Sequence, residues 1–392
     1  MESQIRTVPP IFAALTLLLW LGACTTLPKP DIPLPPEKPP VATAAPSLQM
    51  SSWAAITGWQ DDNHAAAWGA FLQSCIGLKN QPSWQPICRS ALDMQQPDGP
   101  MLRDFFENNF IPYQVVNPDG NTAGLITGYY EPLLKGSRIK TSKYRHPLYG
   151  TPDDLLTIDL SSVYPELKGM RLRGRLQGNQ VVPYYNRAEI ENGKAPLKGR
   201  EILWVDNAID LFFLQVQGSG RVQLENGDTV RVGYDNQNGY PYKSIGRVLV
   251  ERGELPLEKA SLQGIKDWAL KNPDKVTELL NTNASYVFFR EGPNHQNGPT
   301  GSLGVPLTTG RSLAVDPRAI PMGAPVFLST TWPNTDKPLN RLMLAQDTGG
   351  AIKGGVRADF FWGFGNDAGA QAGKMRQKGQ LWVLLPKGYP VP

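Results

Sequence analysis

The sequence contains little cysteine and little histidine, and neither residue type gathers into a cluster. Among its 392 residues are three cysteines and three histidines, and the histidines lie far apart at His64, His146 and His295. Zinc sites need several such ligands, and Ser-His-Asp catalysis needs a histidine near its partners. The sequence therefore lacks the parts for zinc, haem or Ser-His-Asp chemistry.

The sequence also lacks a strong charge of one sign and a long apolar run. Its 39 Lys and Arg residues against 35 Asp and Glu residues leave a net charge of +4, without basic blocks. This distribution does not suggest nucleic-acid binding, although it suits an anionic polymer. The apolar run at 11–20 is shorter than the roughly 20 residues that a membrane-spanning helix requires.

The N-terminus has the features of an export signal. Arg6 precedes the apolar run, which ends in Leu-Gly-Ala directly before Cys24. This pattern resembles the bacterial lipobox, which implies cleavage before Cys24 and acylation of its thiol. Thr25 follows the cysteine, and by the same resemblance a non-acidic residue there implies sorting to the outer membrane, where several acyl chains give durable anchoring. The alternative is an ordinary secretory signal with a chance cysteine.

After the signal peptide at 1–23, a proline-rich stretch at 24–47 cannot bury a core and is predicted to be an extended tether. The rest of the chain is long enough for two domains.

Because an exported chain meets an oxidising compartment, the remaining Cys75 and Cys88 are predicted to form a disulfide. Such a bridge would add roughly 3 kcal/mol of stability. Two buried free thiols are the alternative.

Helical patterns appear early in the chain, and strand patterns dominate later. Apolar residues at helical spacing between Trp68 and Cys75 follow the capping candidates Asp62 and Asn63, and Pro100 opens a second helix that extends to Phe110. Further helices are expected at 244–251 and 261–270. Short strands are expected at 125–127, 203–205, 211–216, 222–224, 229–234, 325–328, 342–345, 357–362 and 381–385. Short strands with glycine turns favour barrels over a doubly wound α/β fold.

The residues that carry chemistry are concentrated at 345–363. Glycines between Asp347 and Asp359 allow the backbone to approach a ligand closely and to form turns that other residues avoid. On a strand at 357–362, Asp359 would share a face with Arg357 and Phe361.

The neighbours of Asp359 suggest how its chemistry is tuned. Phe360 and Trp362 are expected to supply an apolar surround, so the pKa of the Asp359 carboxyl should rise from about 3.9 toward neutrality. Repulsion from Asp347 would raise it further. A carboxyl group that is protonated at neutral pH can act as a general acid.

The segments at 347–350 and 357–360 resemble the three-aspartate module of the membrane-bound lytic murein transglycosylase A family. Strings that accompany this module in the family occur in the same order at 127–130, 216–220, 244–246 and 286–289. The resemblance extends from about Leu125 to the C-terminus, whereas the region before Leu125 matches weakly.

The resemblance implies a mainly β fold with peripheral helices. Its double-psi β-barrel domain would be built from 48–131 and 291–392, the latter carrying the three-aspartate module. A second β-rich domain at 132–290 would be inserted between them, with a glycan groove separating the two.

The resemblance also implies an enzyme that cleaves peptidoglycan strands between N-acetylmuramic acid and N-acetylglucosamine and leaves 1,6-anhydromuramoyl ends. Asp359 would act as acid and then as base, with Asp347 as a second aspartate at the site. No metal or organic cofactor is needed, because the acceptor hydroxyl belongs to the substrate. The expected partners are peptidoglycan, the outer membrane and cell-wall synthesis enzymes.

The expected substrate-binding residues are Thr127, Gly128, Tyr129, Tyr130, Gln217, Gly218, Ser219, Gly220, Gly349, Gly350 and Lys353.

Several alternatives remain open at this point. Tyr129 and Tyr130 would stack on sugars or be core tyrosines, and Asp367 would be the third aspartate or a helix cap. A glycan hydrolase using Asp359 with Asp347 as base would leave free reducing ends. A non-catalytic murein-binding lipoprotein would use the glycine-rich segment only as a turn scaffold.

Overall fold

The computed structural model describes residues 47–167, 170–292 and 298–390. All of these belong to one compact unit. The predicted signal peptide, the lipidated Cys24 and almost all of the tether lie outside the described residues. Within the described ranges, no helix is both long and apolar enough to cross a bilayer.

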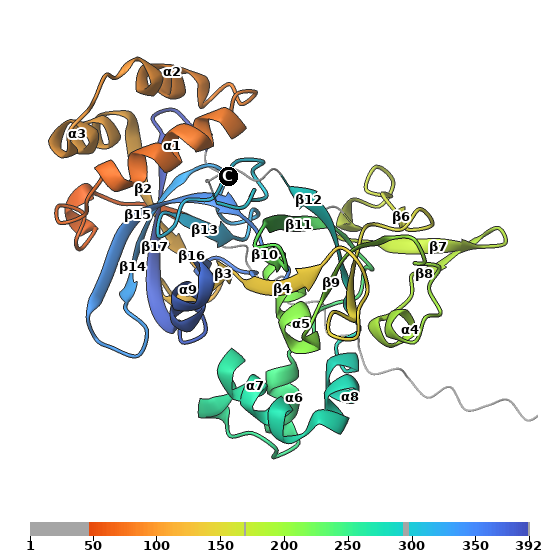
Figure 1. Cartoon of the computed structure of the whole chain (residues 1–392). Coiled ribbons are helices and arrows are strands. Elements are labelled where there is room, and N and C mark those ends of the chain that lie inside the picture. Colours follow the sequence, from red (N-terminus) through yellow and green to blue (C-terminus); the bar gives the residue numbers. More distant parts are fainter. Residues whose placement is uncertain (1–46, 168–169, 293–297, 391–392) are drawn as a thin grey trace, which may run out of the picture. The chain divides into compact units, whose positions relative to one another are not determined.

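The largest sheet has eight strands and closes on itself (Figure 1). The first half of its last strand pairs with β3 and the second half with β2, so a six-stranded barrel forms in the order β17-β14-β15-β13-β16-β3. The neighbours β3 and β16 run parallel, as do β13 and β15. The strands are β1 (Ser47–Met50), β2 (Phe110–Val116), β3 (Gly124–Glu131), β13 (Ser312–Val315), β14 (Pro325–Thr331), β15 (Pro338–Asp347), β16 (Arg357–Phe364) and β17 (Arg376–Pro386).

Several barrel strands are buried on both faces. All four residues of β13 are buried, as are the first four of β14 and the last six of β17. The reason is that one face of each strand fills the barrel and the other packs against helices, which makes the sequence of these strands nearly continuously apolar. Aromatic and aliphatic side chains from both layers form one large core.

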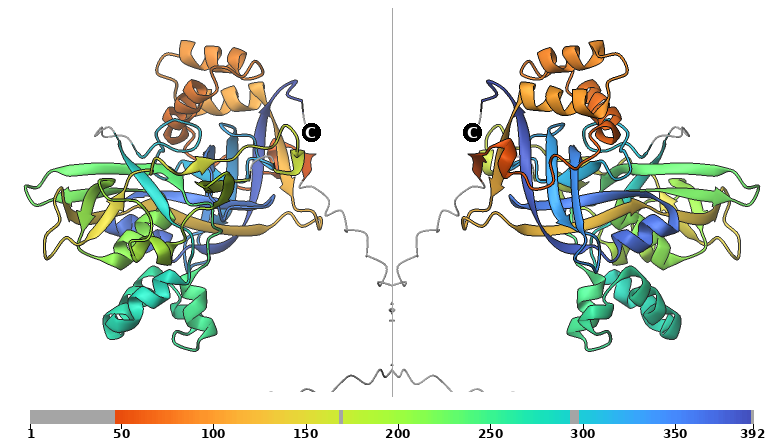
Figure 2. Two further views of the ribbon diagram at one scale, coloured as in Figure 1. Left: turned by 90° about the vertical axis from the view of Figure 1, so that its right-hand side faces the viewer. Right: turned by 90° about the vertical axis from the view of Figure 1, so that its left-hand side faces the viewer.

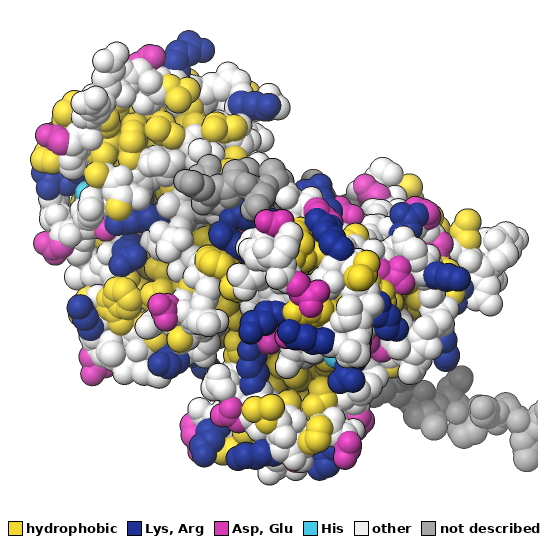
Figure 3. All heavy atoms as spheres, viewed as in Figure 1, with side chains coloured by type: hydrophobic (Ala, Val, Ile, Leu, Met, Phe, Trp, Pro, Cys, Tyr) yellow, Lys and Arg dark blue, Asp and Glu magenta, His cyan; other side chains and the backbone are white. Residues whose placement is uncertain are grey.

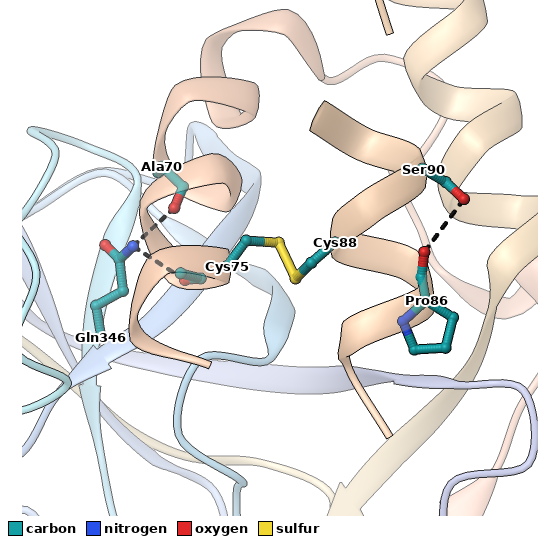
Figure 4. Close-up of a disulfide and its surroundings, with 7 residues drawn as sticks. Ala70, Cys75, Pro86, Cys88, Ser90 and Gln346 are labelled. Carbon is teal, nitrogen blue, oxygen red and sulfur yellow. Dashed lines mark hydrogen bonds between the residues drawn. A yellow bond between two sulfur atoms is a disulfide. The ribbon is translucent and has the colours of Figure 1, made fainter. Parts of the chain in front are cut away.

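Three helices cover the barrel: α1 (Ala65–Gly77), α2 (Gln85–Asp93) and α3 (Gly99–Asn109). The Cys75–Cys88 disulfide joins α1 to α2, with 5.4 Å between the Cα atoms (Figure 4). The predicted disulfide is therefore present, whereas α2 itself was not anticipated from the sequence.

The prediction that Asp62 caps the first helix is wrong. The residue at the cap position of α1 is His64, and Asn63 Oδ1 accepts from the Ala66 amide at 3.3 Å. Asp62 is instead buried in a bidentate ion pair with Arg311, with distances of 2.8 and 3.0 Å. A local capping pattern cannot reveal a partner that lies 249 residues away in the chain.

The middle of the chain forms a six-stranded and a three-stranded sheet. The six-stranded sheet has the order β12-β11-β10-β4-β9-β5, and the smaller one β6-β7-β8. The strands are β4 (Leu133–Ser137), β5 (His146–Tyr149), β6 (Leu156–Thr157), β7 (Arg173–Gln177), β8 (Gln180–Pro183), β9 (Glu201–Val205), β10 (Ser219–Leu224), β11 (Thr229–Gln237) and β12 (Val287–Gly292).

Helices accompany these smaller sheets, and α6–α8 gather into one group beside α5 (Figures 1 and 2). They have their own apolar cluster, built around Phe212, Leu249 and Trp268. The helices are α4 (Arg187–Glu191), α5 (Ala208–Gln217), α6 (Ile245–Glu251), α7 (Leu262–Lys271) and α8 (Val276–Asn281).

The strand predicted at 211–216 is wrong, because these residues lie in helix α5. Asn207 caps the helix by accepting from the amides of Ile209 and Asp210, and Gly218 ends it with a φ of +79°. The run appeared strand-like because α5 is apolar over most of its surface, and burial on several sides hides the helical period. The prediction of a mainly β fold with a barrel and peripheral helices is nevertheless confirmed.

Candidate active site

A pocket of about 940 Å³ brings both aspartates of the glycine-rich segment together with residues of the six-stranded sheet. Its wall includes Asp347 and Asp359 from the barrel and reaches β11 and β12 on the other side. Of the residues that the sequence nominated for substrate binding, the pocket wall contains Gly128, Tyr129, Gln217, Gly218, Ser219, Gly349 and Gly350.

Asp359 is positioned by the pairing of two parallel strands. In the register of β16 with β3, Asp359 lies directly opposite Thr127. The Thr127 hydroxyl donates a hydrogen bond of 2.7 Å to Asp359 Oδ1. Thr127 does not line the pocket, so its hydroxyl contacts Asp359 and not the pocket space.

The environment of Asp359 favours its protonated form. Burial raises the pKa of its carboxyl from 3.8 to about 6, and the negative charge of Asp347 adds to this effect. The Thr127 hydrogen bond and the positive charge of Arg357 oppose it. About one tenth of Asp359 is therefore protonated at pH 7, a far larger fraction than for an ordinary aspartate, and this fraction can act as a general acid.

The prediction that Phe360 and Trp362 form the apolar surroundings of the Asp359 carboxyl is wrong. Phe360 and Trp362 lie with their rings 4.6 Å apart and pack into the main barrel core, away from the pocket. Strand alternation forces this outcome, because neighbours in sequence face opposite sides. The apolar residue on the same face as Asp359 is Phe361, whose ring lies 5.1 Å from that of Tyr129.

Strand β13 sets the relation between the two aspartates. Ala314 on β13 pairs with Asp347 of β15 on one side and with Asp359 of β16 on the other. The alanine methyl group is therefore the only side chain between the two aspartates in this row of the sheet. Because neighbouring strands are about 4.8 Å apart, the two aspartate backbones are separated by roughly 10 Å. A bulge in β15 creates this alignment by moving Asp347, rather than Gln346, into register with Ala314.

Gln346 points instead into the core and fastens β15 to α1. Its side-chain amide donates to the Ala70 carbonyl at 2.8 Å and to Ser74 Oγ at 3.0 Å (Figure 4). Its carbonyl oxygen accepts from Ser312 Oγ at 2.6 Å. These bonds hold the strand immediately before Asp347.

Asp347 is heavily hydrogen-bonded by its surroundings. Its Oδ1 accepts from the Ser302 amide at 3.0 Å, the Ser302 hydroxyl at 2.9 Å and the Thr348 amide at 2.9 Å. Burial raises the pKa of Asp347, and these hydrogen bonds oppose the rise. Asp347 therefore fixes the loop at Ser302 against the glycine-rich turn.

The two neighbouring tyrosines have different surroundings. Tyr129 is 8% exposed and lines the pocket, and burial together with the charges of Asp347 and Asp359 raises its pKa well above the usual value. Tyr130 instead packs on Gly369 of α9 (Gly365–Ala372), and its amide donates to Gln217 Oε1 at 3.0 Å.

Some of the other expected site residues lie away from the pocket wall. Gly220 packs tightly against Leu214, because a Cβ there would lie 2.4 Å from Leu214 Cδ1. Lys353 is exposed and lies outside the wall. Asp367 is exposed in the first turn of α9 and lies outside the pocket wall, but the cap position is Phe364 and no side chain makes a capping hydrogen bond there, so Asp367 is not the helix cap.

Sequence reasoning missed the basic residues that enter the pocket from the six-stranded-sheet side, namely Arg171, Arg231 and Arg290. The sequence contains one indication of a basic surface in this region, because arginine occurs at every second position from 171 to 175. Arg231 is ion-paired with the fully buried Glu131 at 3.2 Å. Glu131 ends β3 and also binds Arg221 at 2.9 Å, so this pair of contacts joins the barrel strand to the six-stranded sheet.

No group of three or more His, Cys, Asp or Glu side chains is arranged to hold a metal ion within residues 47–167, 170–292 and 298–390. The site offers two buried carboxyl groups with raised pKa values, of which Asp347 is anchored by hydrogen bonds, and a large pocket with both polar and apolar groups in its wall.

Two family models match this chain. The one described as "MltA specific insert domain" matches residues 125–290, and the one described as "3D domain" matches residues 311–385. The first contains the six-stranded sheet, and the second contains Asp347 and Asp359.

Curated and solved proteins give a consistent result. The chain is 35% identical over 267 residues to the membrane-bound lytic murein transglycosylase A of Vibrio cholerae, which covers 66% of this chain and 65% of that protein. The matched region is thus slightly less than two thirds of the relative's length. The structure of MltA from Neisseria gonorrhoeae is similar with a TM-score of 0.76 and 38% identity, covering 88% of this chain and 94% of that one. Escherichia coli MltA with bound chitohexaose gives a TM-score of 0.65 at 26% identity, with coverage of 88% and 95%.

Proposed function

This chain belongs to the membrane-bound lytic murein transglycosylase A (MltA) family, and from that premise we propose that it cleaves peptidoglycan by transglycosylation. The bond broken is the β-1,4 link between N-acetylmuramic acid and N-acetylglucosamine. The observation that carries the proposal is the pKa of Asp359, raised to about 6 in the wall of a pocket that is large enough for several sugars.

In the first step, the protonated Asp359 donates its proton to the glycosidic oxygen. The bond from that oxygen to C1 of the muramoyl residue breaks, and the N-acetylglucosamine side leaves with a free hydroxyl. Positive charge develops at C1, as in other glycoside cleavages. The Asp359 carboxylate that remains lies close to this charge.

In the second step, the Asp359 carboxylate takes the proton from the C6 hydroxyl of the same muramoyl residue. The C6 oxygen bonds to C1 and gives a 1,6-anhydro ring, so no water is consumed and Asp359 returns to its starting state. A single carboxyl with a pKa of about 6 suits both steps, because it can give and take a proton near neutral pH.

Asp347 supports this chemistry in the proposal without exchanging protons with substrate. Its Oδ1 accepts three hydrogen bonds from Ser302 and Thr348, which fix the orientation of the carboxyl group. Its charge also helps to keep the pKa of Asp359 high. In the hydrolytic alternative Asp347 would act as the base on a water molecule, and the reaction products distinguish the two.

The glycan is proposed to bind along the pocket between Gly349-Gly350 on the barrel side and Gln217-Gly218-Ser219 on the other. The end of α5 at Gly218 places backbone groups of this second segment in the wall. We further propose a division into a barrel domain, 48–131 with 291–392, and an inserted domain, 132–290, so that the substrate lies between them.

The products distinguish the possible functions. Digestion of purified sacculi should release muropeptides with 1,6-anhydromuramoyl ends, identified by mass spectrometry, and these should contain no ¹⁸O when the reaction runs in labelled water. Labelled reducing ends would establish a hydrolase instead. A murein-binding protein without activity would release no fragments.

Membrane association is proposed to occur through lipid on Cys24, at the periplasmic face of the outer membrane. The lipobox-like residues before Cys24 and the membrane-bound relatives support this location. Cys24→Ala should abolish the incorporation of labelled fatty acid and yield either a soluble protein or an uncleaved precursor. Equal labelling of the variant and the wild type would contradict lipidation at this residue.

A further inference from the structure

Arg171 enters the pocket opposite the glycine-rich turn. Its guanidinium Nη1 lies 3.9 Å from the position that a Cβ atom would occupy at Gly350. Its guanidinium carbon lies 5.9 Å from the ring centroid of Tyr234. The guanidinium therefore lies close to the Gly350 backbone, and both residues line the pocket at a point that the barrel and the six-stranded sheet both border.

The segment that carries Arg171 is fastened to β11. Two residues further along, Arg173 Nε donates to Asn236 Oδ1 at 2.7 Å. Gly239, with a φ of +88°, fits closely beneath Arg173, where a Cβ would lie 2.8 Å from Arg173 Cβ. The Arg171 backbone is thereby held beside the pocket.

Arg171 differs from the other arginines of the pocket wall in what surrounds it. Arg231 pairs with Glu131 at 3.2 Å, Arg290 lies 4.0 Å from Asp235, and Arg357 interacts with Asp359. In the described part of the chain, no carboxylate lies within 4.0 Å of the Arg171 guanidinium, and its one specific neighbour is the Tyr234 ring.

A guanidinium stays charged at all physiological pH values and matches the two oxygens of a carboxylate. A bare glycan of N-acetylglucosamine offers no such group. A murein strand does, because the C3 substituent of each muramoyl residue carries a carboxylate: on the stem peptide where one is attached, or on the lactyl group where the peptide has been removed.

We propose that Arg171 binds a carboxylate on the C3 substituent of a muramoyl residue and so makes the pocket selective for murein over uncharged chito-oligosaccharides. The inference rests on the proposed function, since it assumes that muramoyl strands occupy this pocket. Tyr234 positions the guanidinium, and the pocket beside it supplies the space for the carboxylate.

The test measures dissociation constants in the Asp359→Asn background, with and without Arg171→Gln. Three ligands are compared: peptide-bearing strands, strands stripped of peptide by an amidase, and chitohexaose. Loss of one charge-assisted hydrogen bond should weaken the binding of a carboxylate-bearing strand by about ten-fold, while the affinity for chitohexaose stays the same. Weakening for intact strands alone would assign the stem-peptide carboxylate, and weakening for stripped strands alone the lactyl carboxylate.

The matched control is Arg247→Gln on α6, which removes the same charge from a side chain that is 80% exposed and lies outside the pocket wall. It should leave all three affinities unchanged, because Arg247 does not line the pocket. On the face shown in Figure 3, positive and negative side chains are interspersed. Equal weakening for chitohexaose, or no weakening for either murein strand, would overturn the proposal. This test measures binding, whereas the proposed function is tested by product analysis, so the two can fail separately. If the wild-type protein releases no anhydro ends, the proposed function is refuted, and the binding comparison can still be interpreted.

Discussion

The hydroxyl of Thr127 donates a 2.7 Å hydrogen bond to Oδ1 of Asp359 from the position directly opposite it on the neighbouring parallel strand. This bond stabilises the carboxylate form and lowers the pKa of Asp359, whereas burial and Asp347 raise it. The pKa of about 6 is thus a balance between opposing effects, and each can be altered separately.

Replacing Thr127 with valine should move the alkaline limb of the activity profile to higher pH. The hydrogen bond that favours the charged form is lost, so Asp359 keeps its proton further into the alkaline range. Thr127→Ser, which retains the hydroxyl, should keep the wild-type profile. The measurement is kcat/KM against pH on soluble glycan strands, and an unchanged or acid-shifted limb in the valine variant would contradict the prediction.

Asp359→Asn should lower turnover by about 10⁴-fold or more, because one group acts as both acid and base. The same substitution should stabilise the fold at alkaline pH. The folded-state pKa of about 6 lies above the ordinary 3.8, so wild-type stability falls as pH rises through about 6. The asparagine variant has no charge to bury. Thermal unfolding should therefore show a gain in Tm for the variant near pH 8 that shrinks toward pH 4. A gain that is larger at pH 4 would contradict the assignment.

Asp347→Asn should reduce activity and shift the alkaline limb to lower pH, opposite to the effect of Thr127→Val. Removing the negative charge takes away one of the influences that raise the pKa of Asp359. Ser302→Ala weakens the same loop anchor but keeps the charge, so it should reduce activity without that acid shift. If Asp347→Asn moved the limb upward, the two carboxyls would not interact as the structure indicates.

Removing the Cys75–Cys88 disulfide should destabilise the protein by about 3 kcal/mol, because its loop no longer restricts the unfolded chain. The bridge joins α1 to α2 on the outer side of the barrel core. Cys75→Ser combined with Cys88→Ser should therefore lower the midpoint of urea unfolding while leaving kcat close to the wild-type value at low temperature. Titration of the denatured, unreduced mature protein should find no free thiols, and two titratable thiols would refute the bridge.

The sequence singled out the two aspartates that the structure brings to one pocket. Aspartates spaced by glycines singled out Asp347 and Asp359, and alternation placed Asp359 on a strand. These features are local, since they depend on neighbours in the chain and on periods of two or four residues. Local reasoning failed where burial erased the period, as in α5, and where it assigned the apolar surround to Phe360 and Trp362.

What the sequence by itself determined was therefore the pair of aspartates proposed for catalysis, the disulfide partners and the mainly β character of the chain. Only the tertiary structure decided how Asp359 is tuned, because Thr127 reaches it across 232 residues through strand register, and a bulge in β15 turns Asp347 toward the same pocket. It also decided that Arg171 lies beside Gly350 in the pocket wall. Register, bulges and contacts between distant segments arise from the packing of the whole chain, so no local pattern specifies them.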